Sequence, residues 1–353
     1  MNDTAASPAP PVNLNCESDA GFAQWMAESG GSLAISTYQA GRLFMVGWNG
    51  RQVSFLPRAF DRPMGLDVSA DGRMALVTRN AVWLFADTPA LAPNYLQPGR
   101  YDSLYLPRAT YHMPDLSLHD IAFAGDTLWM VNTRLSCLAT LSLVHTFEPR
   151  WRPPFIDDLV PEDRCHLNGL ALRDGAPAYV TAISDSDTFD GWRGHRRDGG
   201  IVIDIGTREI VVSGLSMPHS PRWYRDRLWL HNSGTGEFGT VDVGSGKFQP
   251  VAFCPGYLRG LSFIGKYAVA GLSRPRENKT FTGLALDDQL ASRRMDARCG
   301  LYVIDLDTGG IAHSLTIEGV VTELYDVVVL PGRLQPAAIG PTSPETKNYI
   351  SVG

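Results

Sequence analysis

The stretch Leu167-Asn168-Gly169-Leu170-Ala171-Leu172 has the length of one β-strand, and segments of similar pattern begin at positions 63, 118, 218, 258 and 324. In most copies a small or polar residue near the start is followed by apolar, β-branched or aromatic residues. Corresponding positions lie about 40 to 66 residues apart. This spacing is expected for the four-stranded blades of a β-propeller when the connecting loops differ in length.

The residues that follow most copies support this prediction. A turn signal such as Asp71-Gly72 precedes a second apolar run at residues 74–78. Third and fourth strands are expected at residues 200–205 and 209–213, on either side of a Gly-Thr turn. Each copy is therefore predicted to be the innermost strand of a four-stranded antiparallel unit.

The two ends of the chain complement each other. The last copy, near residue 324, has no further strands after it, whereas three strand-like segments near residues 32–38, 42–48 and 52–56 precede the first copy. We therefore expect an all-β, six-bladed β-propeller that is closed when the C-terminal strand joins the N-terminal blade.

The regions outside the ring are expected to be short. Residues 1–16 are small, polar and Pro-rich, which predicts a disordered N-terminal tail. A short helix is expected within residues 17–30, where Phe22, Trp25 and Met26 recur at helical spacing after the candidate cap Ser18. The predicted organisation is thus a tail over 1–16, a single propeller domain over 17–333 and a C-terminal tail over 334–353.

Composition restricts the classes of partner. The net charge of −6 and the pI near 5.7 give no reason to expect a nucleic acid or an anionic membrane as partner. The first residues have no positive n-region or apolar run, so we expect neither a signal peptide nor an anchor. No apolar stretch approaches the roughly 20 residues of a membrane span. The five cysteines are scattered and form no CxxC motif, which predicts a cytoplasmic protein.

The residue at one register position in each copy predicts where a functional site would lie. In a propeller the innermost strand begins, and the second strand ends, at the same mouth of the central channel. We call the six residues at this register the mouth ring: Met64, His119, Asn168, His219, Arg259 and Tyr325. The second strands add Asn132 and Asn232 at the same mouth. Buried polar groups at strand ends often serve only to satisfy neighbouring blades, so a purely structural role is the alternative for each of them.

Arginine residues add a charge to this face. Two insertions between second and third strands, at residues 184–199 and 273–300, contain Arg193, Arg274 and Arg276, and Arg134 occupies an equivalent turn. Guanidinium groups bind carboxylates and phosphates through paired hydrogen bonds, so this pattern favours a small anionic molecule or an acidic peptide as ligand. The alternative is that these arginines are solvated and paired with nearby aspartates.

The sequence offers no familiar catalytic or metal-binding motif that would indicate a function. It contains no GxSxG, HExxH or EF-hand sequence. Cys165 and His166 are adjacent, but neighbouring side chains on an extended strand point to opposite faces, so we do not expect them to act on each other.

Four runs carry a family resemblance: DRCHLNGLAL at 163–172, GLSMPHSPRW at 214–223, LSRPREN at 272–278 and ELYDVVVLPG at 323–332. They resemble an uncharacterised bacterial family of conserved hypothetical proteins, a domain of unknown function, and the resemblance implies no activity. More distantly, the chain is similar to six-bladed propellers of the gluconolactonase and strictosidine synthase type. That resemblance implies a divalent cation at the mouth, but the ring offers Asn168 without a glutamate, and Asp67, Asp120 and Asp326 lie off the ring register.

The predicted function is the binding of a small anionic or polar molecule at the mouth, with hydrolase, lyase or isomerase activity as one possibility. His119 and His219 would be ligands of a softer divalent metal or, with Tyr325, proton-transfer groups. Asn168, Asn132 and Asn232 would orient the ligand. The arginines that would hold its anionic group are Arg259, Arg274, Arg276, Arg134 and Arg193. The alternative is a non-enzymatic scaffold for a protein or peptide, anchored by Trp48, Trp151 and Trp192.

Overall fold

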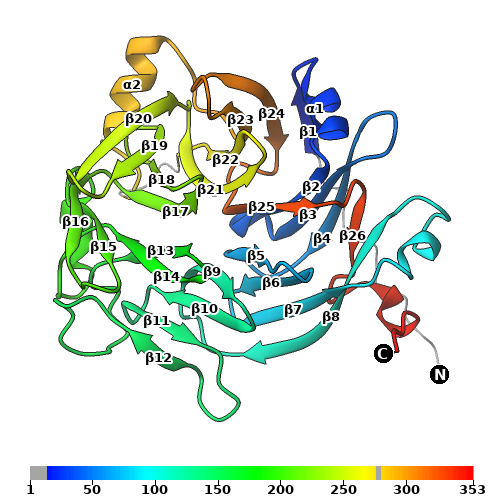
Figure 1. Cartoon of the computed structure of the whole chain (residues 1–353), viewed down its shortest axis with the longest axis horizontal. Helices are drawn as coiled ribbons and strands as arrows, with labels where there is room; N and C mark the ends of the chain where they lie inside the picture. The colour runs from blue at the N-terminus through cyan, green and yellow to red at the C-terminus, as the bar shows by residue number, and fades with distance from the viewer. Residues whose placement is uncertain (1–13, 276–279, 353) are drawn as a thin grey trace.

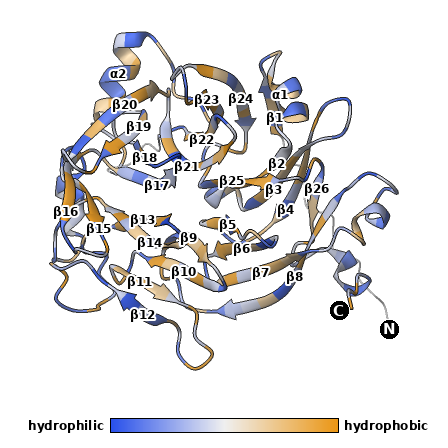
Figure 2. Cartoon of the chain, in the orientation of Figure 1, coloured by the Kyte–Doolittle hydropathy of each residue, from blue (hydrophilic) through white to orange (hydrophobic). Residues whose placement is uncertain are grey.

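The computed structural model, which describes residues 14–275 and 280–352, is a six-bladed β-propeller (Figure 1). Six sheets are arranged around a central channel, and each predicted copy forms the innermost strand of one sheet. All described strand pairs are antiparallel except one at the outer edge of the second sheet. The prediction of an all-β fold with six blades is confirmed. In Figure 2, apolar residues line the strands inside the blades and polar residues dominate the outer loops.

The first three blades take their strands from the two ends of the chain and from its first half. Blade 1 contains β25 (Asp326–Pro331), β2 (Gly31–Ser36), β3 (Arg42–Trp48) and β4 (Val53–Ala59). Blade 2 contains β5 (Leu66–Val68), β6 (Arg73–Thr78), β7 (Ala81–Asp87), β8 (Ser103–His112) and the added strand β26 (Pro336–Ala338). Blade 3 contains β9 (Leu118–Ala124), β10 (Thr127–Asn132), β11 (Cys137–Thr140) and β12 (Glu148–Trp151).

The other three blades follow in order. Blade 4 contains β13 (Leu167–Arg173), β14 (Ala176–Ala182), β15 (Gly200–Asp204) and β16 (Ile210–Leu215). Blade 5 contains β17 (Pro218–Tyr224), β18 (Arg227–Asn232), β19 (Glu237–Asp242) and β20 (Lys247–Phe253). Blade 6 contains β21 (Tyr257–Ile264), β22 (Tyr267–Ser273), β23 (Gly300–Asp305), β24 (Ile311–Gly319) and the added strand β1 (Leu14–Ser18).

The ring closes as predicted. β25 pairs antiparallel with β2, from Gly31 opposite Pro331 to Ser36 opposite Asp326, so a C-terminal strand completes the N-terminal blade. The apolar residues of β25 are buried against blades 2 and 6, which joins the first and last blades in one continuous core.

The segments outside the ring differ from expectation. Residues 14–16, in the segment expected to be disordered, belong to β1, which pairs with the outer edge of β24. The expected helix is limited to α1 (Phe22–Glu28), because the Asp19 carboxylate accepts hydrogen bonds from the backbone N–H groups of Gly21 and Phe22. Ser18 is therefore a strand residue and no cap. Phe22, Trp25 and Met26 are buried as the helical spacing predicted.

The C-terminal segment is also held against the ring. β26 pairs in parallel with β8, and Ile339 is buried beside it. The remaining helices are α2 (Ala285–Arg293) and the short 3-10 helices η1 (Tyr38–Ala40), η2 (Ala92–Asn94), η3 (Gly191–His195) and η4 (Pro344–Lys347). Within the described ranges, no helix has both the length and the apolar character needed to cross a membrane.

Below the mouth, polar side chains of the inner strands join each blade to the next. We call them the waist ring: Asp67, Asp120, Ser220, Arg222, Ser262 and Asp326. The carboxylates of Asp326, Asp67 and Asp120 accept backbone N–H groups of Leu66, Phe123 and Leu170 at 2.7 to 3.0 Å. The hydroxyl oxygens of Ser220 and Ser262 accept hydrogen bonds from the backbone N–H groups of Gly260 and Val329, each at 3.0 Å.

Blades 4 and 5 are joined by a side chain of the later blade, which acts as donor. The guanidinium of Arg222 in blade 5 donates to the carbonyl of Leu170 in blade 4 at 3.1 Å. The same guanidinium binds both oxygens of Asp120, at 2.7 and 3.0 Å, and lies 3.9 Å from Asp326. The inner strands also approach closely, since a Cβ on Gly260 would lie 2.6 Å from the backbone nitrogen of Val327. With φ of +77° as well, this position requires glycine. The waist ring therefore fixes the spacing of the blades on which the mouth is built.

Candidate functional site

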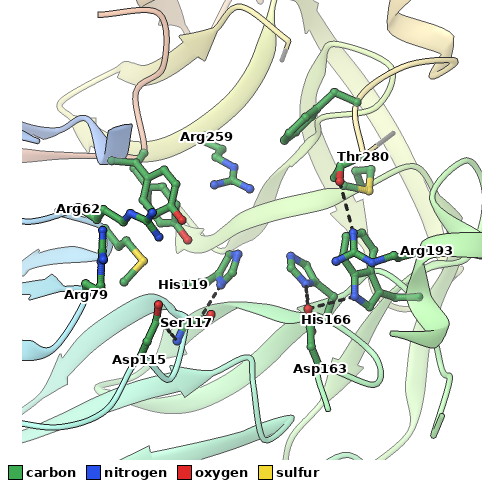
Figure 3. A pocket seen from close by; sticks show the side chains of 16 residues that line it. Arg62, Arg79, Asp115, Ser117, His119, Asp163, His166, Arg193, Arg259 and Thr280 are labelled. Carbon is green, nitrogen blue, oxygen red and sulfur yellow. Dashed lines mark hydrogen bonds and ion pairs between the residues drawn. The ribbon is translucent and has the colours of Figure 1, made fainter. Parts of the chain in front are cut away.

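A cavity of about 240 Å³ opens at the predicted mouth of the channel (Figure 3). Blades 1 to 6 all contribute to its wall, and the insertions after β14 and β22 cover part of it with Trp192, Arg193 and Phe281. The sixteen lining residues are Tyr38, Arg62, Met64, Arg79, Asp115, Ser117, His119, Asp163, His166, Trp192, Arg193, Met217, Arg259, Thr280, Phe281 and Tyr325. Four arginines and two aspartates give this wall an excess of positive charge.

The structure brings together some of the predicted residues and separates others. His119, Arg259, Tyr325 and Arg193 line the cavity. Asn168 and His219 lie under it, around a void of about 10 Å³ that has room for about one water molecule.

Four other predicted ligand residues do not line the cavity. Asn132 and Asn232 are buried, and their side-chain oxygens accept backbone N–H groups of Leu135 and Ser216, which fits a structural role. The amide nitrogen of Asn132 has no hydrogen-bond partner among the described residues. Arg134 donates to the carbonyl of Asp115, and Arg274 lies 3.8 Å from Glu318. Arg276 lies outside the described residues.

Arg259 has unusual surroundings for a buried charge. Its side chain is 9% exposed, its Nε atom has no hydrogen-bond partner among the described residues, and its nearest carboxylate, Glu323, is 4.0 Å away. The guanidinium instead lies over the rings of Tyr325 and Tyr257, at 4.7 and 5.7 Å from their centroids. In Figure 3 it projects toward the cavity, with no dashed line to any residue drawn.

Tyr325 supplies a second hydrogen-bond donor of this kind. Its hydroxyl is buried and has no hydrogen-bond partner in the described part of the chain. Burial raises the pKa of this phenol, although the positive charge of Arg259 opposes the shift, so the hydroxyl keeps its proton. Two neighbouring residues that line the cavity, Arg259 and Tyr325, therefore each carry a buried donor without an acceptor among the described residues.

The imidazole of His119 is held by its Nδ1 atom. That atom lies 2.8 Å from the carbonyl of Ser117 and 2.8 Å from the hydroxyl of Thr133, which itself donates to the carbonyl of Leu167. Because both neighbouring oxygens act as acceptors, the hydrogen-bond network assigns the proton to Nδ1. The ring packs against Tyr325 on one side and against His166 on the other, at centroid distances of 5.7 and 4.6 Å.

His219 is buried below the mouth with both ring nitrogens in hydrogen bonds. Nδ1 lies 2.8 Å from the carbonyl of Met217, and Nε2 lies 3.3 Å from the amide nitrogen of Asn168. The amide of Asn168 is oriented in turn by a hydrogen bond from Thr181 to its oxygen. Burial and the nearby charge of Arg259 hold the pKa of His219 well below its usual value, so this imidazole is neutral.

His166 is a residue of the mouth that the sequence did not predict. Its Nδ1 atom lies 2.9 Å from the carboxylate of Asp163, which also accepts a hydrogen bond from the indole of Trp192 at 3.0 Å. Its ring lies 4.2 Å from that of Trp192, and Arg193 covers the indole at 4.4 Å. Trp192, expected as an exposed anchor for a partner, is only 2% exposed because it forms part of this wall.

A signal for His166 exists in the sequence. It directly precedes an inner strand, as Ser117 and Met217 do, and all three adopt the left-handed backbone conformation with φ of 50° to 53°. This conformation turns the residue before the strand toward the mouth. Cys165, the neighbour of His166 in the sequence, is fully buried.

Backbone strain is concentrated at this cavity. Six of the sixteen lining residues have positive φ, out of fifteen such non-glycine residues among those described: Tyr38, Arg62, Ser117, Asp163, His166 and Met217. The left-handed conformation costs roughly 1 to 2 kcal/mol for an ordinary residue. Residues held in such conformations cluster at functional sites, where the surrounding structure compensates for the strain.

The donor set does not fit a metal ion. Among residues 14–275 and 280–352, no group of three or more His, Cys, Asp or Glu side chains is arranged to hold one. Both nitrogens of His219 are engaged, and the waist carboxylates of Asp120 and Asp326 bind Arg222 and backbone N–H groups. We therefore derive no chemical step through a metal.

The comparisons with known proteins identify a family and a fold. The model of a domain of unknown function, DUF4915, matches residues 20–339. A comparison with curated proteins gave no match.

Solved structures with similar architecture include one titled crystal structure of the nidogen/laminin complex, with TM-score 0.54, 10% identity, and coverage of 86% of this chain and 99% of the other. A protein of unknown function from Bacteroides caccae has TM-score 0.52 and 7% identity, with 85% and 99% covered. A streptogramin B lyase has TM-score 0.40 and 11% identity, with 67% and 75% covered. At these identities the likeness concerns the fold alone.

Proposed function

The chain belongs to the DUF4915 family, and we propose that it binds a small molecule with a carboxylate or phosphate group at the mouth of its channel. The observation that supports this proposal most is Arg259, a buried guanidinium whose Nε atom lacks a hydrogen-bond partner among the described residues and whose nearest carboxylate is 4.0 Å away. A buried charge is costly unless it is paired and hydrogen-bonded. An anion in the cavity would supply both.

The neighbouring hydroxyl of Tyr325 gives the ligand a second contact. The buried hydroxyl and the guanidinium both line the cavity, and the guanidinium carbon lies 4.7 Å from the centre of the Tyr325 ring. An oxygen atom of a carboxylate or phosphate between these donors would accept from both. The cavity of about 240 Å³ favours a small molecule, or a single acidic side chain of a peptide.

Other charged residues of the wall would add a longer-range attraction. Arg79 lies 3.3 Å from Asp61, and Arg193 lies 2.8 Å from Asp190, so both are already paired. Arg62 lies over the ring of Tyr38 at 5.7 Å. These exposed groups would attract an anion to the mouth, and Arg259 would hold it inside.

We also propose roles for the other predicted ligand residues, a cellular location and a second candidate function. Asn168 and His219 would shape the floor beneath the ligand, and Arg274 would act from the edge of the second insertion. Arg276, which lies outside the described residues, is still proposed to bind the ligand on the sequence pattern alone. A cytoplasmic location is proposed on the scattered cysteines, and a protein-binding role is the weaker candidate, because Trp192 is buried in the wall.

The test is calorimetric titration of the purified protein with short carboxylates, with inorganic phosphate and with the neutral amides of the same carboxylates. We expect at least one carboxylate or phosphate to bind, and its affinity to fall at least tenfold in Arg259→Met, as expected for loss of a charged hydrogen bond of about 1.5 to 3 kcal/mol. Arg227→Gln, which changes an exposed arginine at the start of β18, is the matched control. Equal binding of the amides, or unchanged affinity in Arg259→Met, would contradict the proposal.

A further inference from the structure

The wall of the mouth contains an unbroken series of ring contacts. Arg259 lies over Tyr325, Tyr325 packs against His119, and His119 packs against His166. Trp192 and Arg193 extend the series beyond His166. A molecule whose anionic group is held by Arg259 would therefore have its next atoms along His119 and His166.

His166 has the arrangement of an oriented general base. Its Nδ1 atom lies 2.9 Å from the carboxylate of Asp163, which can act only as an acceptor when it is ionised, so this bond places the proton on Nδ1. The Nε2 atom is left with its lone pair and makes no hydrogen bond among the described residues. The indole of Trp192 holds the Asp163 carboxylate from a second direction. A base that is itself oriented by a third group is the recurring pattern of active sites.

The backbone supports a functional role for this pair. His166 and Asp163 both have left-handed backbone conformations, with φ of 53° and 48°. Neither is a glycine, so the fold maintains strain at both residues that form the pair.

The two unpartnered donors suit a negative charge that develops during a reaction. When a proton leaves a carbon next to a carboxylate or carbonyl group, the electron pair moves onto oxygen. Preorganised donors at that oxygen are among the strongest contributions to catalysis. Arg259 and the Tyr325 hydroxyl are such donors, and burial raises the pKa of Tyr325 so that it stays a donor.

We propose that the mouth catalyses a proton-transfer isomerisation of a small carboxylate, in which His166 is the general base and Asp163 positions it. This inference rests on the proposed anion site. His166 Nε2 takes a proton from the carbon next to the anionic or carbonyl group, and the electron pair forms an enolate held by Arg259 and Tyr325. The same imidazole then returns the proton to a different atom of that substrate. The enzyme ends in its starting state, and no oxidant, reductant or water is consumed.

The experiment follows solvent exchange in D2O. The full chain is incubated with 2-oxo and 2-hydroxy carboxylates of three to six carbons, and proton NMR records the loss of the C–H signal next to the carbonyl or carboxylate. Calorimetry on the same compounds gives Kd. We expect at least one compound that binds to exchange faster than it does in buffer.

Three variants separate the roles. His166→Gln should lower the exchange rate about 10²- to 10⁴-fold with Kd within about threefold, because general base catalysis contributes this much to the rate. Asp163→Asn should lower it at least about a hundredfold with Kd unchanged, because an amide NH₂ facing Nδ1 would move the ring proton to Nε2. His145→Gln, in the exposed loop between β11 and β12, is the matched histidine control and should behave as the wild type.

The possible failures are distinguishable. Binding without exchange above the buffer rate would overturn the isomerisation and leave the anion site intact. Exchange that survives His166→Gln would overturn the role of His166. If phosphate binds but no carboxylate does, the isomerisation fails and the anion site stands. If neither a carboxylate nor phosphate binds, both proposals fail. Thermal unfolding of His166→Gln and Asp163→Asn verifies that both variants are folded, and Kd retained in either variant provides a second check.

Discussion

The mouth ring and the waist ring lie on or next to the same inner strands, one or a few residues apart. Their buried arginines nevertheless differ in how completely they are paired. At the waist, Arg222 binds both oxygens of Asp120 and a backbone carbonyl. At the mouth, Arg259 on the next blade is more deeply buried than Arg222, with 9% of its side chain exposed against 21%. It nevertheless has one carboxylate at 4.0 Å and an Nε atom without a partner in the described part of the chain. The well-paired charge of Arg222 serves the fold, whereas the poorly paired charge of Arg259, a residue that lines the cavity, supports the proposed anion site.

The two arginines provide the strongest test of this comparison. Arg222→Met should lower the free energy of unfolding by about 3 to 5 kcal/mol, because the buried carboxylates of Asp120 and Asp326 lose their counter-charge. Urea unfolding followed by tryptophan fluorescence measures the change. A loss below about 1 kcal/mol would show that the waist does not hold the blades together.

The pH dependence of stability gives the next largest effect. Burial raises the pKa of Asp67 to about 6, against the hydrogen bond from Phe123 and the charge of Arg222, which lower it. Because the folded state holds this proton more tightly than the unfolded state, the contribution is full below about pH 4 and is lost as the pH rises through about 6. The loss amounts to at most about 3 kcal/mol.

Asp67→Asn should flatten this part of the stability profile, measured as urea midpoints between pH 4 and 7 in wild type and variant. Asp71, an exposed carboxylate on the same hairpin, provides the control through Asp71→Asn. An unchanged slope in Asp67→Asn would exclude Asp67 as its source.

At the mouth, replacing the corresponding arginine should increase the stability of the protein rather than lower it. Arg259→Met is expected to raise the free energy of unfolding by about 1 to 2 kcal/mol in the absence of ligand, because it removes a buried charge that is poorly paired. The same urea experiment measures it. Destabilisation as large as that of Arg222→Met would mean that Arg259 is structural.

Removing one hydroxyl group from each ring tests the same comparison, with smaller expected changes in stability. Ser262→Ala should cost about 1 kcal/mol, because the backbone N–H of Val329 loses its acceptor. Tyr325→Phe should change stability by less than about 0.5 kcal/mol, since the hydroxyl has no partner among the described residues to lose. Thermal unfolding midpoints of the two variants, compared with wild type, measure the difference. Equal losses would remove the distinction between the rings.

The fold could be predicted because repetition at a fixed register is a property of the sequence itself. Six similar segments and three unmatched strands at the start were enough to predict the blades and their closure through β25. The ends of the ring were harder. β1 and β26 add to blades 6 and 2 through backbone pairing, which leaves little trace in side-chain pattern.

The site was predicted only in part, for a physical reason. Register identified Arg259, Tyr325 and His119, since all three lie at or next to the start of an inner strand. It could not tell which polar residues are already satisfied, and Asn232, bonded to the backbone of Ser216, is an example. His166 was missed because its direction depends on a left-handed backbone angle that the residue type does not reveal.

The closure of the ring also has a consequence for the synthesis of the protein. β2 lacks its inner neighbour until β25 is made, about 290 residues later. At 5 to 20 residues per second, the ribosome takes roughly 15 to 60 s to cover that distance. During this time the apolar inner edge of the first blade has no strand to cover it. Unpaired strand edges favour aggregation, so this interval is the period of greatest risk for the nascent chain. The mouth, built from all six blades, can form only after the last strand has emerged.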